Sequence, residues 1–304
     1  MFTAKRLDEL YRSAGKIHID NHSQIVFMSD IHRGDNSVID EFGQNRLLYE
    51  HALQYYYRNG FTYVELGDGD ELWEVTDYRN IALAHPAVFE TLRNFQKQGR
   101  LLMISGNHNG QIVKPGYARK YMERTYDGFL GEDVEILPGV RPVEAAIFVY
   151  DPSGQEIFAI HGHQGELISD YLSPVALFTN RYIWRYFHKA GFRYCANPTR
   201  NRNQPARREK VYRKWLMDND LILICGHTHR PRLSYPGEPP YFNTGCTVHP
   251  RGITCIEFIF GELALVSWNL QTRRDGMIYV ERKIMKNAVQ IDSFLVKNNR
   301  EETP

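Results

Sequence analysis

The sequence predicts an α/β fold with parallel strands, and two observations carry that prediction. Short apolar runs alternate with segments of helical pattern up to residue 105, and such alternation favours parallel pairing. Each apolar run is followed at once by polar side chains that can bind a metal ion. Because ligands of such sheets bind beyond the carboxyl ends of the strands, we expect these side chains to face one crevice.

The first half of the chain repeats a unit of strand, polar loop and helix. A helix over residues 1–18 is expected at the edge of the fold. The unit itself then predicts strands at 24–28, 61–66 and 101–105, with helices at 42–59 and 86–98.

The second half changes character. The turn at 151–154 separates two apolar runs and predicts a β-hairpin over 143–160. A helical segment is expected over 165–216, followed by the buried strand 221–224 and a further strand at 241–245. Short connections predict antiparallel pairing for the last strands, at 253–260, 263–268 and 277–284.

Composition sets broad limits on the class of protein. The 304 residues are 42% apolar and 24% charged, which is ordinary for a globular protein that buries a core. No apolar run approaches the ~20 residues of a membrane span, and the amino terminus does not resemble a signal peptide. The four cysteines show no paired short spacing, so we expect reduced thiols and a cytoplasmic protein.

Seven side chains at the ends of the predicted strands form a mixed oxygen and nitrogen ligand set. Alone, each has an ordinary explanation, such as a helix cap for an aspartate. Together they suit manganese, iron or zinc, and they are too numerous for one tetrahedral ion. Two ions ~3.5–4 Å apart would clamp a phosphoryl transfer and acidify a bridging water. The seven are Asp30, His32, Asp68, Asn107, His161, His227 and His229.

The order of these motifs resembles the calcineurin-like metallophosphoesterase superfamily. The motifs are Asp-x-His, Gly-Asp-x-x-Glu, Gly-Asn-His, His-Gly-His and Gly-His-Thr-His, and they span residues 30–229. The resemblance implies one domain over 1–304, folded as a four-layer αββα sandwich with two central mixed sheets flanked by helices. It assigns Asp30, His32 and His229 to one ion, Asn107, His161 and His227 to the other, and Asp68 as the bridge.

The resemblance also implies two catalytic side chains. His108 takes the position of the histidine that assists the leaving group, and Glu71 that of the carboxylate that orients it. One departure concerns the residue after Gly-Asn-His, which is usually acidic in the family and is Asn109 here. We expect this change to affect efficiency more than metal binding.

A basic segment separates His163 from His227. Residues 181–214 contain eleven Lys or Arg against one acid, Glu209, a local charge of +10 in a chain whose net charge is +1. One interpretation is a solvated helical face whose apolar side packs on the sheet. The other is a lid-like helical insert, at about 165–216, that attracts an anionic substrate. On that interpretation Arg207 and Arg208 bind substrate.

The insert and the segment 67–74 resemble in part the UDP-2,3-diacylglucosamine hydrolase branch, which cleaves a lipid-linked pyrophosphate with manganese under a helical lid. The strands after residue 250 extend beyond the usual end of that branch. His249 follows the last core strand and has two interpretations, a substrate contact or a structural histidine. His163 also has two interpretations, a residue that supports a metal ligand or a plain loop residue. His18, His22, His51 and His85 are expected at the surface.

The sequence therefore predicts an enzyme that uses a metal-activated hydroxide to hydrolyse a phosphodiester or pyrophosphate. Two divalent ions are expected, manganese first, with iron or zinc as alternatives. A phosphomonoesterase of the protein serine/threonine type is the second reading, although its Asp-Arg-Gly motif is absent. The third is a metal-stabilised module that binds RNA or lipid headgroups. The expected partner is an anionic phosphate ester, nucleotide- or lipid-linked, with nucleic acid and peripheral membrane contact through the insert left open.

Overall fold

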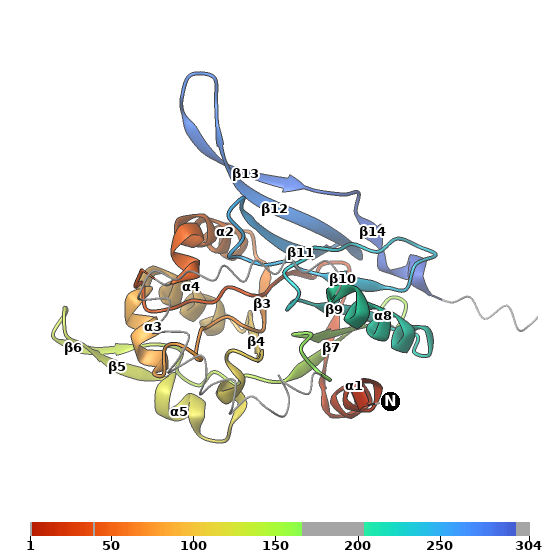
Figure 1. Cartoon of the computed structure of the whole chain (residues 1–304), viewed down its shortest axis with the longest axis horizontal. Helices are drawn as coiled ribbons and strands as arrows, with labels where there is room; N and C mark the ends of the chain where they lie inside the picture. Colours follow the sequence, from red (N-terminus) through yellow and green to blue (C-terminus); the bar gives the residue numbers. More distant parts are fainter. Residues whose placement is uncertain (1, 39, 166–203, 296–304) are drawn as a thin grey trace, which may run out of the picture.

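The computed structural model describes residues 2–38, 40–165 and 204–295, and two β-sheets form its centre (Figure 1). The larger sheet runs in spatial order β13 (Ile278–Ile284), β12 (Glu262–Thr272), β11 (Ile253–Ile259), β2 (Gln24–Met28), β3 (Thr62–Leu66) and β4 (Leu101–Ile104), with β14 (Val289–Gln290) beside β12. The smaller sheet runs β1 (Gly15–Ile19), β7 (Ala145–Tyr150), β8 (Gln155–Ile160), β9 (Ile222–Cys225) and β10 (Tyr241–Asn243).

Three apolar clusters separate four layers. Alternate side chains of a strand face opposite sides, so Val26 and Met28 of β2 join the cluster beneath α2 (Arg46–Arg58) and α4 (Pro86–Lys97). Ile25 and Phe27 join the cluster between the two sheets. The third cluster lies between the smaller sheet and the helices α1 (Phe2–Ser13) and α8 (Gln204–Met217). The predicted αββα order of two mixed sheets flanked by helices is confirmed.

Strand directions place the predicted ligand loops at one end of the molecule. Strands β2, β3 and β4 are parallel neighbours, as predicted, and β8 and β9 are also parallel. The late strands β11, β12 and β13 are antiparallel, also as predicted. Because the ends of parallel strands meet at one edge, the loops after them can converge.

The amino terminus corrects one prediction. The helix expected over residues 1–18 ends at Ser13, and Gly15–Ile19 forms β1, which pairs in parallel with β7. This pairing joins residues more than 125 positions apart, so local pattern does not reveal it. The predicted helix 42–59 is a 3-10 turn, η1 (Glu41–Asn45), followed by α2.

Several short elements were not predicted. They are α3 (Tyr78–Ala84), η2 (Gly110–Val113), α5 (Tyr117–Tyr121), the hairpin of β5 (Arg124–Asp127) and β6 (Glu132–Glu135), and η6 (Ile291–Phe294). Each is seven residues or shorter, too short for a periodic pattern to stand out.

Only the end of the predicted insert, 165–216, can be compared with the structure. Residues 166–203 lie outside the described residues. Helix α8 has Tyr212 and Trp215 buried; Trp215 Nε1 donates to Asp8 on α1 at 2.8 Å, and the Tyr212 hydroxyl reaches Gly162 O. This part of the segment packs its aromatic side on the smaller sheet. No helix in the described part of the chain combines the length and apolar character that a membrane span requires.

Candidate metal centre

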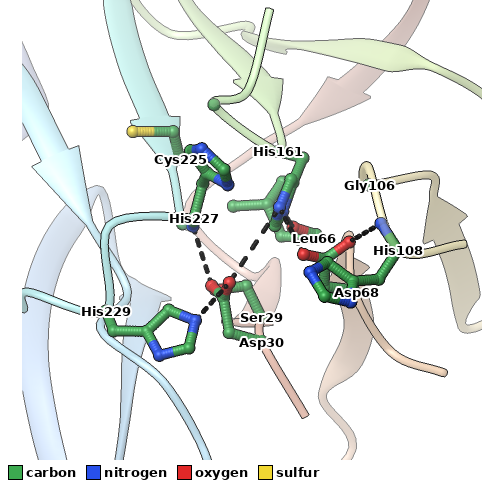
Figure 2. Close-up of polar contacts among 12 residues, drawn as sticks. Ser29, Asp30, Leu66, Asp68, Gly106, His108, His161, Cys225, His227 and His229 are labelled. Atoms are coloured by element: carbon green, nitrogen blue, oxygen red, sulfur yellow. Dashed lines mark hydrogen bonds and ion pairs between the residues drawn. The ribbon is translucent and has the colours of Figure 1, made fainter. Parts of the chain in front are cut away.

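The loops that follow β2, β3, β4, β8 and β9 bring their polar side chains together (Figure 2). Asp30 and His32 follow β2, Asp68 follows β3, and His161 follows β8. His227 and His229 follow β9, so the smaller sheet supplies three imidazoles and the larger sheet supplies both aspartates. His32 also follows a strand of the larger sheet, so both sheets contribute imidazoles to one site and the larger sheet adds the carboxylates.

The first group of ligand atoms comes from Asp30, His32 and His229. These atoms all lie within 4.8 Å of one another. Asp30 Oδ1 is 3.0 Å from His229 Nε2 and 3.9 Å from His32 Nε2. The second oxygen, Oδ2, accepts a hydrogen bond from the backbone N–H of His227 at 2.8 Å, which leaves Oδ1 turned toward the imidazoles.

The second group consists of Asp68, His161 and His227, again within 4.8 Å. Asp68 Oδ1 accepts from the backbone N–H of His108 at 2.8 Å, and Oδ2 lies 3.0 Å from His161 Nε2. His161 Nε2 is also 3.9 Å from Asp30 Oδ1, so one imidazole faces both aspartates and links the two groups.

The hydrogen bond that His161 makes to the backbone directs its other ring nitrogen at Asp68, where a positive charge is needed. Its Nδ1 donates to the carbonyl of Leu66 at 3.0 Å, so Nε2 of the neutral ring carries a lone pair. That lone pair faces the carboxylate of Asp68 across 3.0 Å, and two acceptors at this distance need a positive charge between them. A proton on the ring or a metal ion in the gap can supply it.

Buried ligand atoms without a hydrogen-bond partner point to the same conclusion. They belong to both groups and to the loop after β4. A buried polar atom that lacks a partner costs about 1–3 kcal/mol, so four of them at one site call for an occupant. The carboxylate, amide and imidazole donors fit a divalent transition ion. The four atoms are Asp30 Oδ1, His32 Nε2, Asn107 Oδ1 and His161 Nε2.

Electrostatics keep the two aspartates ionised. Burial alone would raise the pKa of Asp30, but the charges of His229 and His161 outweigh it and hold this pKa below its usual range. Burial would likewise raise the pKa of Asp68, and His161 and His108 hold it well below the usual range. Both carboxylates therefore remain available as anionic ligands at neutral pH.

In these loops, most of the predicted ligand residues themselves have a strained backbone conformation. Five of the seven predicted ligands are non-glycine residues in the left-handed region, with φ between 50° and 65°: Asp30, His32, Asp68, His227 and His229. This conformation is costly for residues with a Cβ, and such strain clusters at functional sites. Neighbouring glycines make the close approach possible, because a Cβ on Gly226 would lie 2.5 Å from Asp30 Oδ2.

A histidine and a carboxylate stand beside the two groups. His108 Nδ1 donates to Glu71 Oε2 at 2.6 Å, and His32 Nδ1 donates to the same oxygen at 3.0 Å. Burial would lower the pKa of His108, but Glu71 and Asp68 raise it to about 9. Glu71 therefore orients both rings, with the Nε2 atom of each facing away from the carboxylate.

The sequence matches the model of the calcineurin-like phosphoesterase family over residues 23–231, more than half of the chain. The chain belongs to this family. No curated protein matches the sequence.

Several solved structures resemble the chain. An archaeal phosphodiesterase is 12% identical with a TM-score of 0.37, covering 86% of this chain and 99% of its own. A predicted phosphoesterase from Streptococcus pneumoniae is 15% identical with a TM-score of 0.33, covering 86% and 97%. Zinc-bound Vps29 from Entamoeba histolytica is 13% identical with a TM-score of 0.36, covering 86% and 99%. TM-scores this low carry no functional argument.

Asn109 is the residue at which this calcineurin-like chain departs from the expected acidic side chain. It is fully buried, and its Oδ1 accepts a hydrogen bond from the backbone N–H of Gly106 at 2.6 Å. This bond closes the loop that carries Asn107 and His108. A carboxylate would accept the same bond, so the departure removes a charge and keeps the loop. The alternative of a binding module, for which Asn109 was the support, stays a prediction.

The structure places the remaining predicted residues at varying distances from the ligands. His163 packs near them, with its ring centroid 5.5 Å from that of His161. His249 lines a cavity together with His229. Arg207 and Arg208 fall in α8, where their side chains are not among those described. His18, His22 and His51 are exposed as expected, but His85 is buried, with Nε2 3.1 Å from Gly34 O and 3.3 Å from Asp40 Oδ2.

Two features of the phosphoesterase site were missed. Trp73 stacks on His108 with centroids 4.0 Å apart, and its Nε1 donates to Asn107 O at 2.7 Å. The fully buried Arg33 contacts Glu65 at 2.7 Å and Asp70 at 2.9 Å behind the loops. The only available signal was position, because Arg33 directly follows the Asp-x-His motif and Trp73 lies in the segment 67–74.

Proposed function

We propose that the chain is a dinuclear-metal phosphoesterase that hydrolyses a phosphodiester or pyrophosphate bond. Family membership supports phosphoester hydrolysis in general. The observation that carries the finer statement is the presence of two adjacent groups of three ligand atoms, Asp30, His32 and His229 in one and Asp68, His161 and His227 in the other. One cation satisfies each group, which makes two.

The proposed ligands divide into the two groups. One ion would be held by Asp30, His32 and His229, and the other by Asn107, His161 and His227, with Asp68 between them. We propose manganese as the ion, with iron or zinc as alternatives, because the ligands combine carboxylate, amide and imidazole. When bound, the ions would supply Lewis-acid charge and a water of lowered pKa.

The chain's own residues supply the remaining steps. The His108 ring, held by Glu71 and stacked on Trp73, stands at the edge of the ligand groups, 4.7 Å from the ring of His32. Its raised pKa keeps the ring protonated in the absence of ions, and nearby cations would lower that pKa toward neutrality. We propose that the proton leaves from Nε2 to the departing oxygen, because Nδ1 is committed to Glu71.

A side-by-side turnover assay tests this function. The manganese-loaded chain is compared on bis(p-nitrophenyl) phosphate, p-nitrophenyl phosphate and a nucleotide-linked pyrophosphate, with Asp68→Ala as the blank. We expect turnover of the diester or the pyrophosphate that the substitution abolishes. Equal turnover by the variant would overturn the proposed mechanism, and preference for the monoester would overturn the proposed substrate class.

A further inference from the structure

A cavity of about 640 Å³ adjoins the candidate metal centre on the side of His229. Its volume lies within the range of about 300–1,000 Å³ that small-molecule sites occupy. His229 forms part of its wall, so a molecule in this cavity would extend directly from the ligand groups. The other lining residues include His249, Arg251, Ser267, Glu281 and Lys283.

These other residues lie beyond the part of the chain that matches the family. The match ends at residue 231, whereas the cavity is lined by the loop 246–252 and by strands β12 and β13. In the register of these strands Ser267 pairs with Lys283 and Asn269 with Glu281, so all four share one face of the hairpin. The opposite face carries Trp268, which packs with α2 in the core. The fold thus buries one face of the hairpin and directs its polar face to the cavity.

The loop that forms the opposite wall is firmly held. Asn45 Nδ2 donates to Thr247 O at 2.6 Å and to His249 O at 2.9 Å, and Gln44 Nε2 donates to Val248 O at 2.6 Å. His249 Nδ1 accepts from the backbone N–H of Arg251 at 3.2 Å, so Nε2 carries the hydrogen in the neutral ring. The Nε2–H group of His249 is therefore a hydrogen-bond donor held in place in this wall.

The charge of the cavity is positive. Arg230, Arg251 and Lys283 line it against one carboxylate, that of Glu281, and Arg251 and Lys283 are exposed. Lysine and arginine bind phosphate groups through charge-assisted hydrogen bonds. Thr254 adds a buried hydroxyl oxygen that has no hydrogen-bond partner. The charged side chains that line the cavity are therefore three cations and one carboxylate, a balance that favours an anion.

We propose that this cavity binds a second phosphate group, carried by the non-reacting part of the substrate, through Arg251, Lys283 and His249. The inference rests on the proposed function, since it places the reacting phosphorus at the ligand groups. It also sharpens that function, because it predicts preference for esters with a second phosphate. His249 and Arg251 belong to the loop before β11 and Lys283 to β13, all beyond the residues that match the family, so the preference would be a property of this part of the chain.

A matched pair of chromogenic esters tests the proposal. Thymidine 5′-(p-nitrophenyl phosphate) and the same compound with an added 3′-phosphate release the same product and differ in one phosphate group. The double variant Arg251→Ala, Lys283→Ala should raise KM for the bisphosphate by about tenfold or more, because charge-assisted bonds are lost, and leave KM for the simple ester nearly unchanged. Arg274→Ala removes a cation of the same hairpin that does not line the cavity and serves as the control.

The outcomes separate the cavity from the mechanism. If the wild-type chain hydrolyses both esters with equal KM, or the double variant affects both alike, the cavity proposal fails and the phosphoesterase stands. If neither ester is hydrolysed, the proposed function fails, and calorimetric titration with thymidine 3′,5′-bisphosphate tests the cavity alone. Binding that is weakened in the double variant but not in Arg274→Ala supports the cavity, and equal affinity in all three proteins overturns it.

Discussion

Two buried clusters of charge draw on the loops that follow β2 and β3, and their carboxylates are neutralised in different ways. Around Arg33, an arginine neutralises the carboxylates of Glu65 and Asp70 through bonds of 2.7–2.9 Å. One oxygen, Asp70 Oδ2, has no hydrogen-bond partner, and burial raises the pKa of Asp70 to about 6 despite Arg33, so a proton can neutralise it. The charges of this cluster are therefore nearly balanced without a bound metal ion.

In the described part of the chain, the charged partners of Asp30 and Asp68 are histidines rather than arginine or lysine. Imidazoles hold the pKa of both aspartates below the usual range, so a proton on the carboxylate is not the solution there. Several ligand atoms remain without partners. Burial of aspartates does not by itself indicate a metal site. Ionised aspartates surrounded by several imidazoles, as Asp30 and Asp68 are, do indicate one.

A matched pair of substitutions gives the largest expected contrast. Asp30→Asn should lower turnover by about 10³-fold, because it removes a ligand charge whose effect on the transition state amounts to several kcal/mol. Asp70→Asn removes a carboxyl of the other cluster and should stay within about tenfold of the wild type, since Asp70 is already partly protonated near neutral pH. Steady-state turnover of a p-nitrophenyl diester measures both. Similar losses in the two variants would erase the distinction between the clusters.

The leaving-group histidine separates chemistry from metal binding. His108→Ala should reduce kcat by about 10²–10³-fold, the usual contribution of a positioned acid, while the bound metal remains unchanged. The variant is assayed beside a metal determination on the same sample. Trp73→Phe, which keeps an aromatic ring beside His108, should retain most activity. Loss of metal from His108→Ala would reassign this residue to the ligands.

Substitutions in the Arg33 cluster should lower the stability of the fold. Arg33→Met leaves Glu65 and Asp70 buried without their cation, and we expect the free energy of unfolding to fall by about 3–5 kcal/mol. Urea unfolding followed by Trp fluorescence measures this change. Arg33→Met with Glu65→Gln removes the arginine and one of its two carboxylate partners and should recover part of the loss. A single variant as stable as the wild type would show that the cluster contributes nothing to the fold.

Asn109 should give the smallest effect. Asn109→Asp retains the acceptor for the Gly106 N–H, so turnover should stay within about threefold, whereas Asn109→Ala loses a buried hydrogen bond worth about 1 kcal/mol and loosens the loop. The ratio of the two kcat values is the readout. If Asn109→Asp is the more damaging variant, the added charge at the site outweighs the hydrogen bond.

The sequence predicts the parts of the site that reside in short contiguous motifs. Asp30, Asp68 and His161 each follow an apolar run, and the strands β2, β3 and β4 are parallel as their alternation with helices predicts. The fold could be predicted because each layer buries an apolar face whose residues recur at a regular spacing in the sequence. Strand β1 could not, since its pairing with β7 depends on a distant partner rather than on local pattern.

The remaining errors are of the same physical kind. His85 was expected at the surface, but helix packing buries it against Gly34 and Asp40. The tautomer of His161 depends on a carbonyl 95 residues away. The cavity beside His229 requires four separate segments to meet, 229–231, 246–254, 267–271 and 281–285. Such relations arise from tertiary contacts, which carry no signal in any single window of sequence.

The most direct test is a calorimetric titration of the metal-stripped chain with manganese. The account predicts two sites per chain, with one or none remaining in Asp30→Asn, and a rise in melting temperature of a few degrees as the sites fill, because ions at about 100 times Kd add about 2.7 kcal/mol to stability. Absence of saturable binding in the wild type, or two intact sites in Asp30→Asn, would contradict the assignment of the metal centre.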